Sequence, residues 1–205
     1  HDHDHDHDHG HGHDHGDGHD HLPDAHHWLD PALASRLVLR LPEALSSAGL
    51  GERSAFSARA EALVSEITGV EAKWRPRLRA VPRKELVTFH DAFDPLAEHF
   101  GLEVVDHLTP LSVAPGQEVT PARLRRVSER VRALGLTTVY AEPQMPRGPL
   151  RMLAEELGIE IRLLDPLGDP RRPGHDGYVV LLETNLRAMY LGQGGDPAEL
   201  PGGSE

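Results

Sequence analysis

The sequence predicts an α/β fold, in which a parallel sheet is covered by helices. From residue 82 onward, short apolar runs alternate with amphipathic helical patterns. Such alternation with short connections is typical of parallel strands joined by helices. The apolar runs lie at 85–89, 102–106, 136–140 and 159–164, and the helical patterns lie at 91–99, 121–134, 147–157 and 177–191. We therefore expect a four-stranded parallel sheet flanked by helices.

A long helix is predicted ahead of the sheet. Within 54–81, apolar side chains from Phe56 to Trp74 recur three or four residues apart, which places them on one helix face. Trp74 is expected on the core face of this helix. Pro76 is expected to end or bend it, because proline lacks the N–H that a helix interior uses.

Another helix is predicted before it, over 30–48. Asp30 is a suitable N-cap, and Pro31 occupies the first helical position, where proline is favoured. Pro42 is expected to kink or divide this stretch.

The first residues have a different composition. Residues 1–21 alternate His with Asp or Gly, and 12 of the 16 His residues lie in the first 27 positions. Such a tract cannot bury apolar surface, so we expect it to be disordered. Imidazole and carboxylate groups bind divalent metals, which predicts a metal-collecting segment. A purification tag is the alternative, although tags are usually uninterrupted His runs.

Four parts follow from these patterns. We expect a disordered His/Asp-rich segment at 1–24, a helical region at 25–81 that includes the long helix, an α/β lobe at 82–191 and a flexible tail at 192–205.

Charge and composition exclude several functions. Of the formal charge of −12, the eight Asp and absent Lys and Arg of 1–24 account for −8, which leaves −4 for the remainder. This mildly acidic remainder has no basic stripe, so we expect no nucleic-acid partner. The chain has no Cys, which excludes thiolate metal sites and disulfides. No secretory signal and no membrane-length apolar run is seen.

Polar residues follow three of the predicted strands. His90 follows the first strand, Glu142 the third and Asp165 the fourth. Ligands of parallel sheets bind at the carboxyl ends of the strands, so these residues form a candidate N/O site for a divalent ion. Taken singly, each residue is also compatible with a structural role, Asp165 as a turn residue before proline.

Two adjacent histidines, His26 and His27, precede the first helix in DAHHWLDP. A single ion would generally take one of them. The apolar side chains of Trp28 and Leu29 would shield such a site from water.

Five segments in order carry a resemblance to a known family: HHWLDP (26–31), TFHDAFDPLAEHFGLEVV (88–105), VYAEPQ (139–144), LLDPLG (163–168) and GYVVLLETNLRAM (177–189). Together they resemble the metal-binding receptors of ABC importers for zinc and manganese, especially the zinc-uptake branch. The resemblance runs from about His26 to Leu191.

The resemblance implies two lobes joined by a long helix, with the metal between them. It maps ligands onto His26 and His90, and an acidic position that is a ligand in some members onto Asp165. It implies an extracytoplasmic, non-enzymatic receptor, periplasmic or on the cell surface, that delivers Zn²⁺ as a monomer to an ABC importer permease. Residues 1–21 occupy the place of the family's His-rich loop.

The chain departs from the family pattern at two places. Ala25 stands where proline is usual. The family's N-terminal lobe, with its first histidine ligand, has no counterpart here, so a truncated or partial form is expected. Water or a His of the 1–21 segment could then complete the coordination.

Two other functions remain open. A zinc hydrolase with an open coordination position is one, with Glu142 as the conceivable base, although no known hydrolase motif is present. A metal buffer that acts through the His-rich segment alone is the other. Two imidazoles and a carboxylate favour zinc over manganese, whereas nickel and cobalt are not excluded by ligand type.

The remaining histidines receive structural interpretations. His99 is expected to be a surface or helix C-terminal residue, and His107 and His175 are expected to be solvated.

Overall fold

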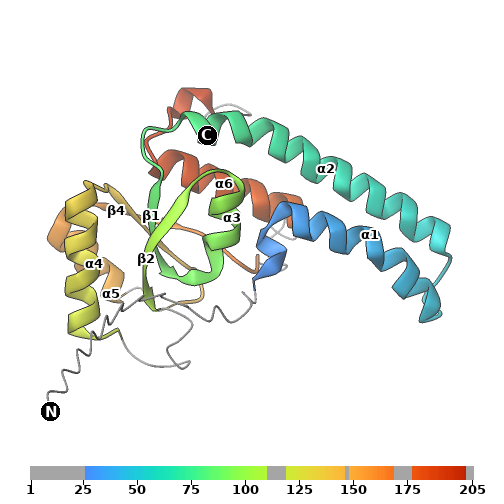
Figure 1. Ribbon diagram of the computed structural model, residues 1–205, viewed down its shortest axis with the longest axis horizontal. Helices are drawn as coiled ribbons and strands as arrows, with labels where there is room; N and C mark the ends of the chain where they lie inside the picture. The colour runs from blue at the N-terminus through green and yellow to red at the C-terminus, as the bar shows by residue number, and fades with distance from the viewer. Residues whose placement is uncertain (1–25, 110–118, 146–147, 169–176, 202–205) are drawn as a thin grey trace, which may run out of the picture.

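The computed structural model describes residues 26–109, 119–145, 148–168 and 177–201 (Figure 1). The expected disordered segment at 1–24 and the expected solvated His175 lie outside these residues. In the described part, four parallel strands form one sheet in the order β2-β1-β3-β4. They are β1 (Glu85–His90), β2 (Glu103–Thr109), β3 (Thr138–Ala141) and β4 (Glu160–Leu163). The predicted four-stranded parallel α/β fold is confirmed.

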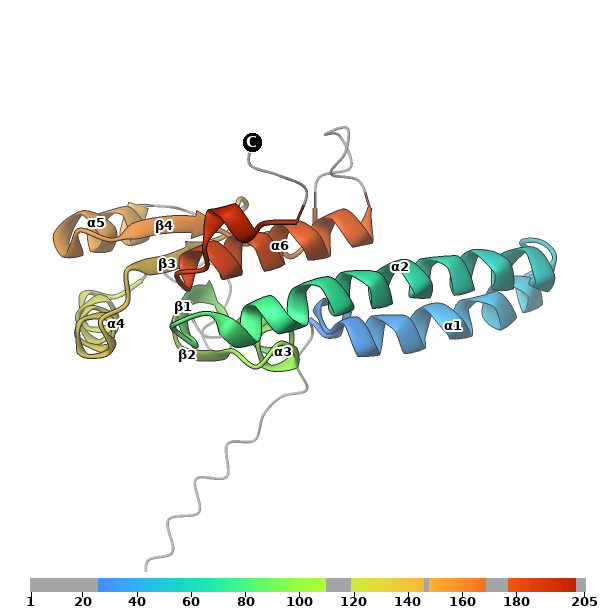
Figure 2. The same cartoon turned by 90° about the horizontal axis from the view of Figure 1, so that it is seen from above.

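Helices cover both faces of the sheet (Figure 2). On one face, α4 (Pro121–Leu134) and α5 (Gly148–Leu157) bury an apolar cluster that includes Val87 and Phe89 of β1. The other face packs against α2 (Arg53–Ala80), α3 (Asp94–His99) and α6 (Tyr178–Gly192). The core on this second face includes Leu86, Leu96, Trp74, Leu186 and Tyr190, among others.

The helices α1 (Pro31–Ser47) and α2 run side by side and extend away from the sheet as a hairpin (Figures 1 and 2). Both helices run through an internal proline, so Pro42 does not divide α1 and Pro76 does not end α2. Near Pro76, Trp74 and Leu78 are both buried in the same core cluster. Packing on either side of the proline therefore holds the helix together, although an interior proline disfavours it by about 3 kcal/mol.

The start of α1 agrees with its sequence signal. The Asp30 side chain accepts hydrogen bonds from the main-chain N–H groups of Ala32 and Leu33, at 2.7 and 3.4 Å. Pro31 occupies the first helical position. A cap of this kind stabilises a helix by about 1 kcal/mol, and it fixes where the preceding segment enters α1.

The described part of 192–205 is more ordered than the expected flexible tail. Pro197–Glu199 form a short 3-10 helix, and Leu200 is 8% exposed within the core cluster. The Arg77 side chain of α2 donates to the main-chain oxygen of Glu199 at 3.0 Å. The segment differs from the prediction because one buried leucine and this contact anchor it against α2.

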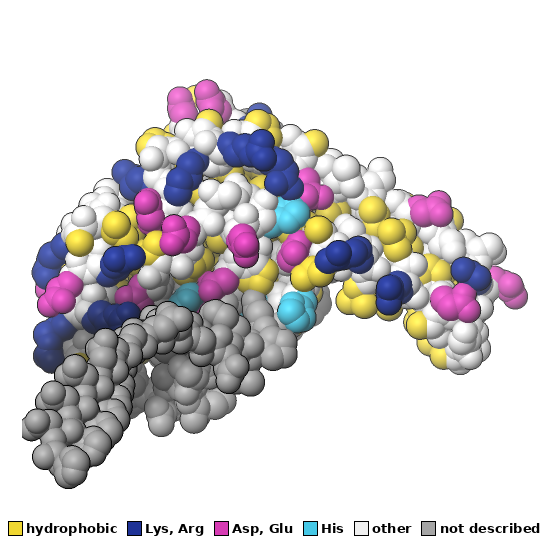
Figure 3. Space-filling view, in the orientation of Figure 1, with side chains coloured by type: hydrophobic (Ala, Val, Ile, Leu, Met, Phe, Trp, Pro, Cys, Tyr) yellow, Lys and Arg dark blue, Asp and Glu magenta, His cyan; other side chains and the backbone are white. Residues whose placement is uncertain are grey.

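The surface is mixed in charge. In Figure 3, basic and acidic side chains are interspersed over the visible face, and its described part carries no continuous basic stripe. Within the described residues, no helix combines the length and apolar character that crossing a bilayer requires.

Candidate metal centre

The strand order places one natural binding position in the sheet. After β1 the chain crosses to β2 through α3, and after β3 it crosses to β4 through α5, on the opposite face. Ligands of open parallel sheets bind at the carboxyl ends of two adjacent strands whose following connections leave toward opposite faces of the sheet. Thr88 of β1 is paired with Tyr140 of β3. The residues two positions further, His90 and Glu142, therefore lie opposite each other at this point.

His90 and Glu142 are in direct contact. Glu142 Oε1 lies 2.7 Å from His90 Nδ1, and the Glu142 side chain is 3% exposed. With an ionised Glu142, the ring carries its proton on Nδ1 and donates it to the carboxylate. The lone pair of the neutral imidazole is then on Nε2, which is the arrangement that metal-binding histidines use.

His26 brings a second imidazole to the same place. Its ring centroid lies 4.9 Å from that of His90, with the two planes at 89°. His26 directly precedes a short 3-10 helix, η1 (His27–Leu29), and its ring also meets that of Trp28 edge to face at 5.3 Å. His27 is exposed. The structure thus brings together His26 and His90, from segments 64 positions apart in the sequence.

Trp28 attaches the His26 segment to the edge of the sheet. Its indole N–H donates to the main-chain oxygen of Pro166 at 2.8 Å, and the Tyr178 hydroxyl donates to the main-chain oxygen of Trp28 at 2.7 Å. Burial raises the pKa of Tyr178, and the charges of Asp30 and Glu71 raise it further. Tyr178 therefore remains a hydrogen-bond donor at neutral pH.

Asp165 is directed into its own loop. Its Oδ1 accepts hydrogen bonds from the main-chain N–H groups of Leu167 and Gly168, both at 3.0 Å, and from the Gln144 side chain at 2.8 Å. The buried Asn185 of α6 makes two hydrogen bonds, each 2.8 Å long, to the main chain of Asp165. Among the described residues, no group of three or more His, Asp or Glu side chains is arranged to hold an ion. The structure thus pairs the two histidines and leaves Asp165 engaged by its turn.

His107 is not solvated, contrary to the prediction. Its Nδ1 lies 2.9 Å from the Thr88 hydroxyl, which in turn donates to the main-chain oxygen of His90 at 2.7 Å. Because the hydroxyl hydrogen is directed to His90, its oxygen accepts from Nδ1–H of His107. His107 Nε2 lies 3.5 Å from a carboxylate oxygen of Asp94. A chain of polar contacts therefore fixes the backbone of His90.

Sequence reasoning placed Glu142 and His90 at the same edge of the sheet but did not identify their contact. The signal that could have found it is the pairing of the two strands, because His90 is the last residue of β1 and Glu142 directly follows β3. No local pattern in the sequence indicates the residues that His107 and His99 contact. His99 is the last residue of α3, as one of its two expected placements had it, and its poorly exposed ring has two acidic neighbours, Asp30 and Glu71.

The sequence profile of the family described as zinc-uptake complex component A, periplasmic, matches residues 1–192. The high-affinity zinc uptake system protein ZnuA of Paracoccus denitrificans is 33% identical over 171 residues, covering 81% of this chain and 50% of the relative. ZnuA of Brucella abortus is 28% identical over 166 residues, covering 81% of this chain and 49% of the relative. The chain spans about half the length of these curated relatives.

Solved structures agree with the fold. The laminin-binding adhesin Lmb of Streptococcus agalactiae, described as having adhesin and metal-transporting activity, matches with a TM-score of 0.73 and 25% identity, covering 83% of this chain and 65% of that one. A Zn(II)-bound AdcAII variant of Streptococcus pneumoniae matches with a TM-score of 0.70 and 26% identity, covering 83% of this chain and 61% of that one.

Proposed function

We propose, because the chain belongs to the family of periplasmic zinc-uptake complex component A proteins, that it binds Zn²⁺ outside the cytoplasm and delivers it to the permease of an ABC importer. Relatives in this family are described as components of high-affinity zinc uptake systems. The metal ion and the permease are its partners, nucleic acid is not among them, and the receptor works as a monomer in the periplasm or at the cell surface.

The observation that carries the proposal is the pair of imidazoles at the sheet edge. The centroids of the His26 and His90 rings lie 4.9 Å apart, and Glu142 orients the ring of His90. Two neutral imidazoles are favourable ligands for zinc, and manganese prefers more oxygen. A buried carboxylate behind a ligating imidazole increases its basicity and fixes its direction.

Asp165 is the third proposed ligand. Its Oδ1 is engaged by the main-chain N–H groups of its loop, so it would bind the ion through Oδ2. A closed zinc site has four ligands. We assign the fourth position to water or to an imidazole of the 1–21 segment, which would also collect zinc near the site.

A receptor requires no catalytic group, and the contacts of Glu142 are those of a residue that positions His90. In a zinc hydrolase it would act as a base on a metal-bound water. Its Oε1 is instead committed to His90, and its side chain is 3% exposed. This engagement favours a positioning role and a function other than catalysis. Zinc-dependent ester or phosphate turnover that is lost in Glu142→Gln, with zinc still bound, would favour the hydrolase.

We retain three parts of the division proposed from the sequence, leaving out the flexible tail. Residues 82–191 form the metal-binding lobe, 25–81 the helical region with the interlobe helix, and 1–24 the metal-collecting segment.

The proposal is tested by calorimetric titration of zinc. The chain, a form without residues 1–21, and that form with His26→Ala and His90→Ala are compared. One tight zinc that survives the deletion and disappears in the double variant supports the lobe site. Loss of all binding on deletion alone would instead support a buffer that acts through the His-rich segment.

A further inference from the structure

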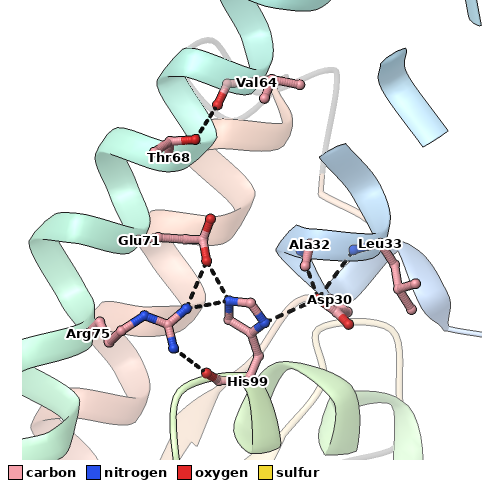
Figure 4. Close-up of polar contacts among 8 residues, drawn as sticks. All are labelled: Asp30, Ala32, Leu33, Val64, Thr68, Glu71, Arg75 and His99. Carbon is pink, nitrogen blue, oxygen red and sulfur yellow. Dashed lines mark hydrogen bonds and ion pairs between the residues drawn. The ribbon is translucent and has the colours of Figure 1, made fainter. Parts of the chain in front are cut away.

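His99 lies at the centre of a polar cluster that joins three separate elements (Figure 4). It is the last residue of α3, and its ring lies between the long helix α2 and the start of α1. Nδ1 is 3.2 Å from Asp30 Oδ1, and Nε2 is 2.5 Å from Glu71 Oε1. One imidazole thus contacts the cap of α1 on one side and a carboxylate of α2 on the other.

Arg75 completes this cluster from α2. Its Nη2 lies 2.8 Å from Glu71 Oε1 and 2.7 Å from His99 Nε2. Its Nη1 donates to the main-chain oxygen of His99 at 2.8 Å. The last carbonyls of a helix lack partners within the helix and favour a cation nearby. Arg75 therefore holds the end of α3 through its main chain as well as its side chain.

The cluster is partly shielded from water, so its ion pairs are screened less than exposed ones. The side chains of His99, Glu71 and Asp30 are 14%, 21% and 22% exposed. Exposed ion pairs contribute little because water screens them, whereas partly buried ones are screened less. The His99 ring also meets Phe100 edge to face at 5.1 Å, so the imidazole is held by packing as well as by polar contacts.

The positions of these residues in the chain connect the cluster to the two candidate ligands. Asp30 follows His26 by four residues, at the end of the turn that carries it. His99 ends α3, which follows His90 through one 3-10 turn, η2 (Asp91–Phe93). The contact between Asp30 and His99 therefore joins the segment that follows His26 to the segment that follows His90.

The His26 turn is consequently held at two points. Trp28 is attached to Pro166 and Tyr178 at the sheet edge, and Asp30 is attached to His99 on the side of α2 and α3. A segment attached at one point can still rotate about it, whereas two attachments fix its direction. We infer that His99, with Glu71 and Arg75, is a positioning residue that sets the placement of His26 relative to His90 for zinc binding. This inference rests on the proposed function.

The first test measures geometry and needs no zinc. The chain has no native Cys, so spin labels attach only at introduced ones. Ala32→Cys in the first turn of α1 and Glu103→Cys in β2 are both exposed positions. Pulsed electron paramagnetic resonance on the full chain should give a narrow distance distribution, and His99→Phe, which keeps a ring but removes both nitrogens, should broaden or shift it. An unchanged distribution overturns the inference.

The second test measures zinc affinity by chelator competition on the full chain. His99→Phe should weaken the tight site by about ten-fold or more, as loss of supporting partners does at other metal sites. His99→Gln, which retains an amide donor, should recover part of the affinity. The control is Val131→Ala, in the apolar cluster on the opposite sheet face. Equal weakening in His99→Phe and Val131→Ala, at matched loss of thermal stability, would show a merely structural role and overturn the inference.

The two tests separate this inference from the proposed function. If the His26→Ala and His90→Ala double variant keeps wild-type zinc affinity, the proposed ligands are wrong. The distance measurement then still decides whether His99 holds the His26 turn.

Discussion

Glu142 Oε1 and His90 Nδ1 are 2.7 Å apart and connect the ends of two adjacent strands. The contact follows from the pairing of Thr88 with Tyr140, two residues earlier on each strand. The direction of the His90 ring therefore depends on a buried carboxylate 52 positions away in the sequence.

Replacing Glu142 by glutamine should lower zinc affinity by about ten-fold. The amide removes the negative charge that increases the basicity of His90, and its NH₂ group can favour the tautomer with the proton on Nε2. Chelator competition measures the change. Glu155→Gln, an exposed substitution on α5, is the matched control and should have no effect. Equal affinities for the two variants would exclude a role for Glu142 in orienting His90.

Asp165→Asn separates the two roles of this residue. An amide oxygen can still accept from the N–H groups of Leu167 and Gly168, so the free energy of unfolding should change by less than about 1 kcal/mol. Zinc affinity should fall clearly, because a neutral amide is a weaker ligand than a carboxylate. Urea unfolding and chelator competition measure the two quantities. Unchanged zinc affinity would remove Asp165 from the ligand set.

The two tryptophans provide a fluorescence test of the site. Trp28 is 36% exposed and lies against the His26 ring, whereas Trp74 is 3% exposed in the core. Zinc should change the emission of the wild type and of Trp74→Phe, and leave that of Trp28→Phe nearly constant. A full zinc response in Trp28→Phe would place the tight site elsewhere.

Stability should decrease in alkaline solution through Tyr140. Burial raises the pKa of Tyr140 above its ordinary value of 10.0. Above that value the unfolded chain loses the phenolic proton while the folded chain retains it. The free energy of unfolding therefore falls as pH rises, by up to about 1.4 kcal/mol per pH unit for this group.

Tyr140→Phe should make this dependence shallower between pH 10 and 12, as measured by urea unfolding. At neutral pH the variant should be less stable by about 1 kcal/mol, because the hydroxyl donates to Gln193 Oε1 at 3.0 Å. An identical alkaline slope in both proteins would contradict the assignment to Tyr140.

The strands and helices could be predicted because their signals are local. The apolar spacing from Phe56 to Trp74 marks the core face of α2, and Asp30 marks the start of α1. The two prolines do not divide or end their helices, because that outcome depends on more than the local sequence. Pro42 and Pro76 are unfavourable locally, and the helices continue because packing elsewhere outweighs that penalty.

The candidate site could be predicted less completely than the fold. The strand ends identified His90 and Asp165, and the proline after Asp165 indicated the turn role in which its Oδ1 accepts from its own loop. The local sequence does not decide between that role and metal binding. The position of His99 at the end of a helix was expected, but its contacts were not, because its partners, Asp30 and Glu71, are distant in sequence. Contacts between distant segments depend on how the helices pack, which the spacing of apolar residues does not specify.

The two imidazoles are carried by different kinds of backbone. His90 ends β1, which is bonded to strands on both sides, whereas His26 lies on a turn before η1. The His90 ring is thus placed by the pairing of the sheet, whereas the His26 ring is placed by side-chain contacts of its turn, through Trp28 and Asp30. A substitution among those contacts can therefore change the position of His26 without disturbing the strands that carry His90.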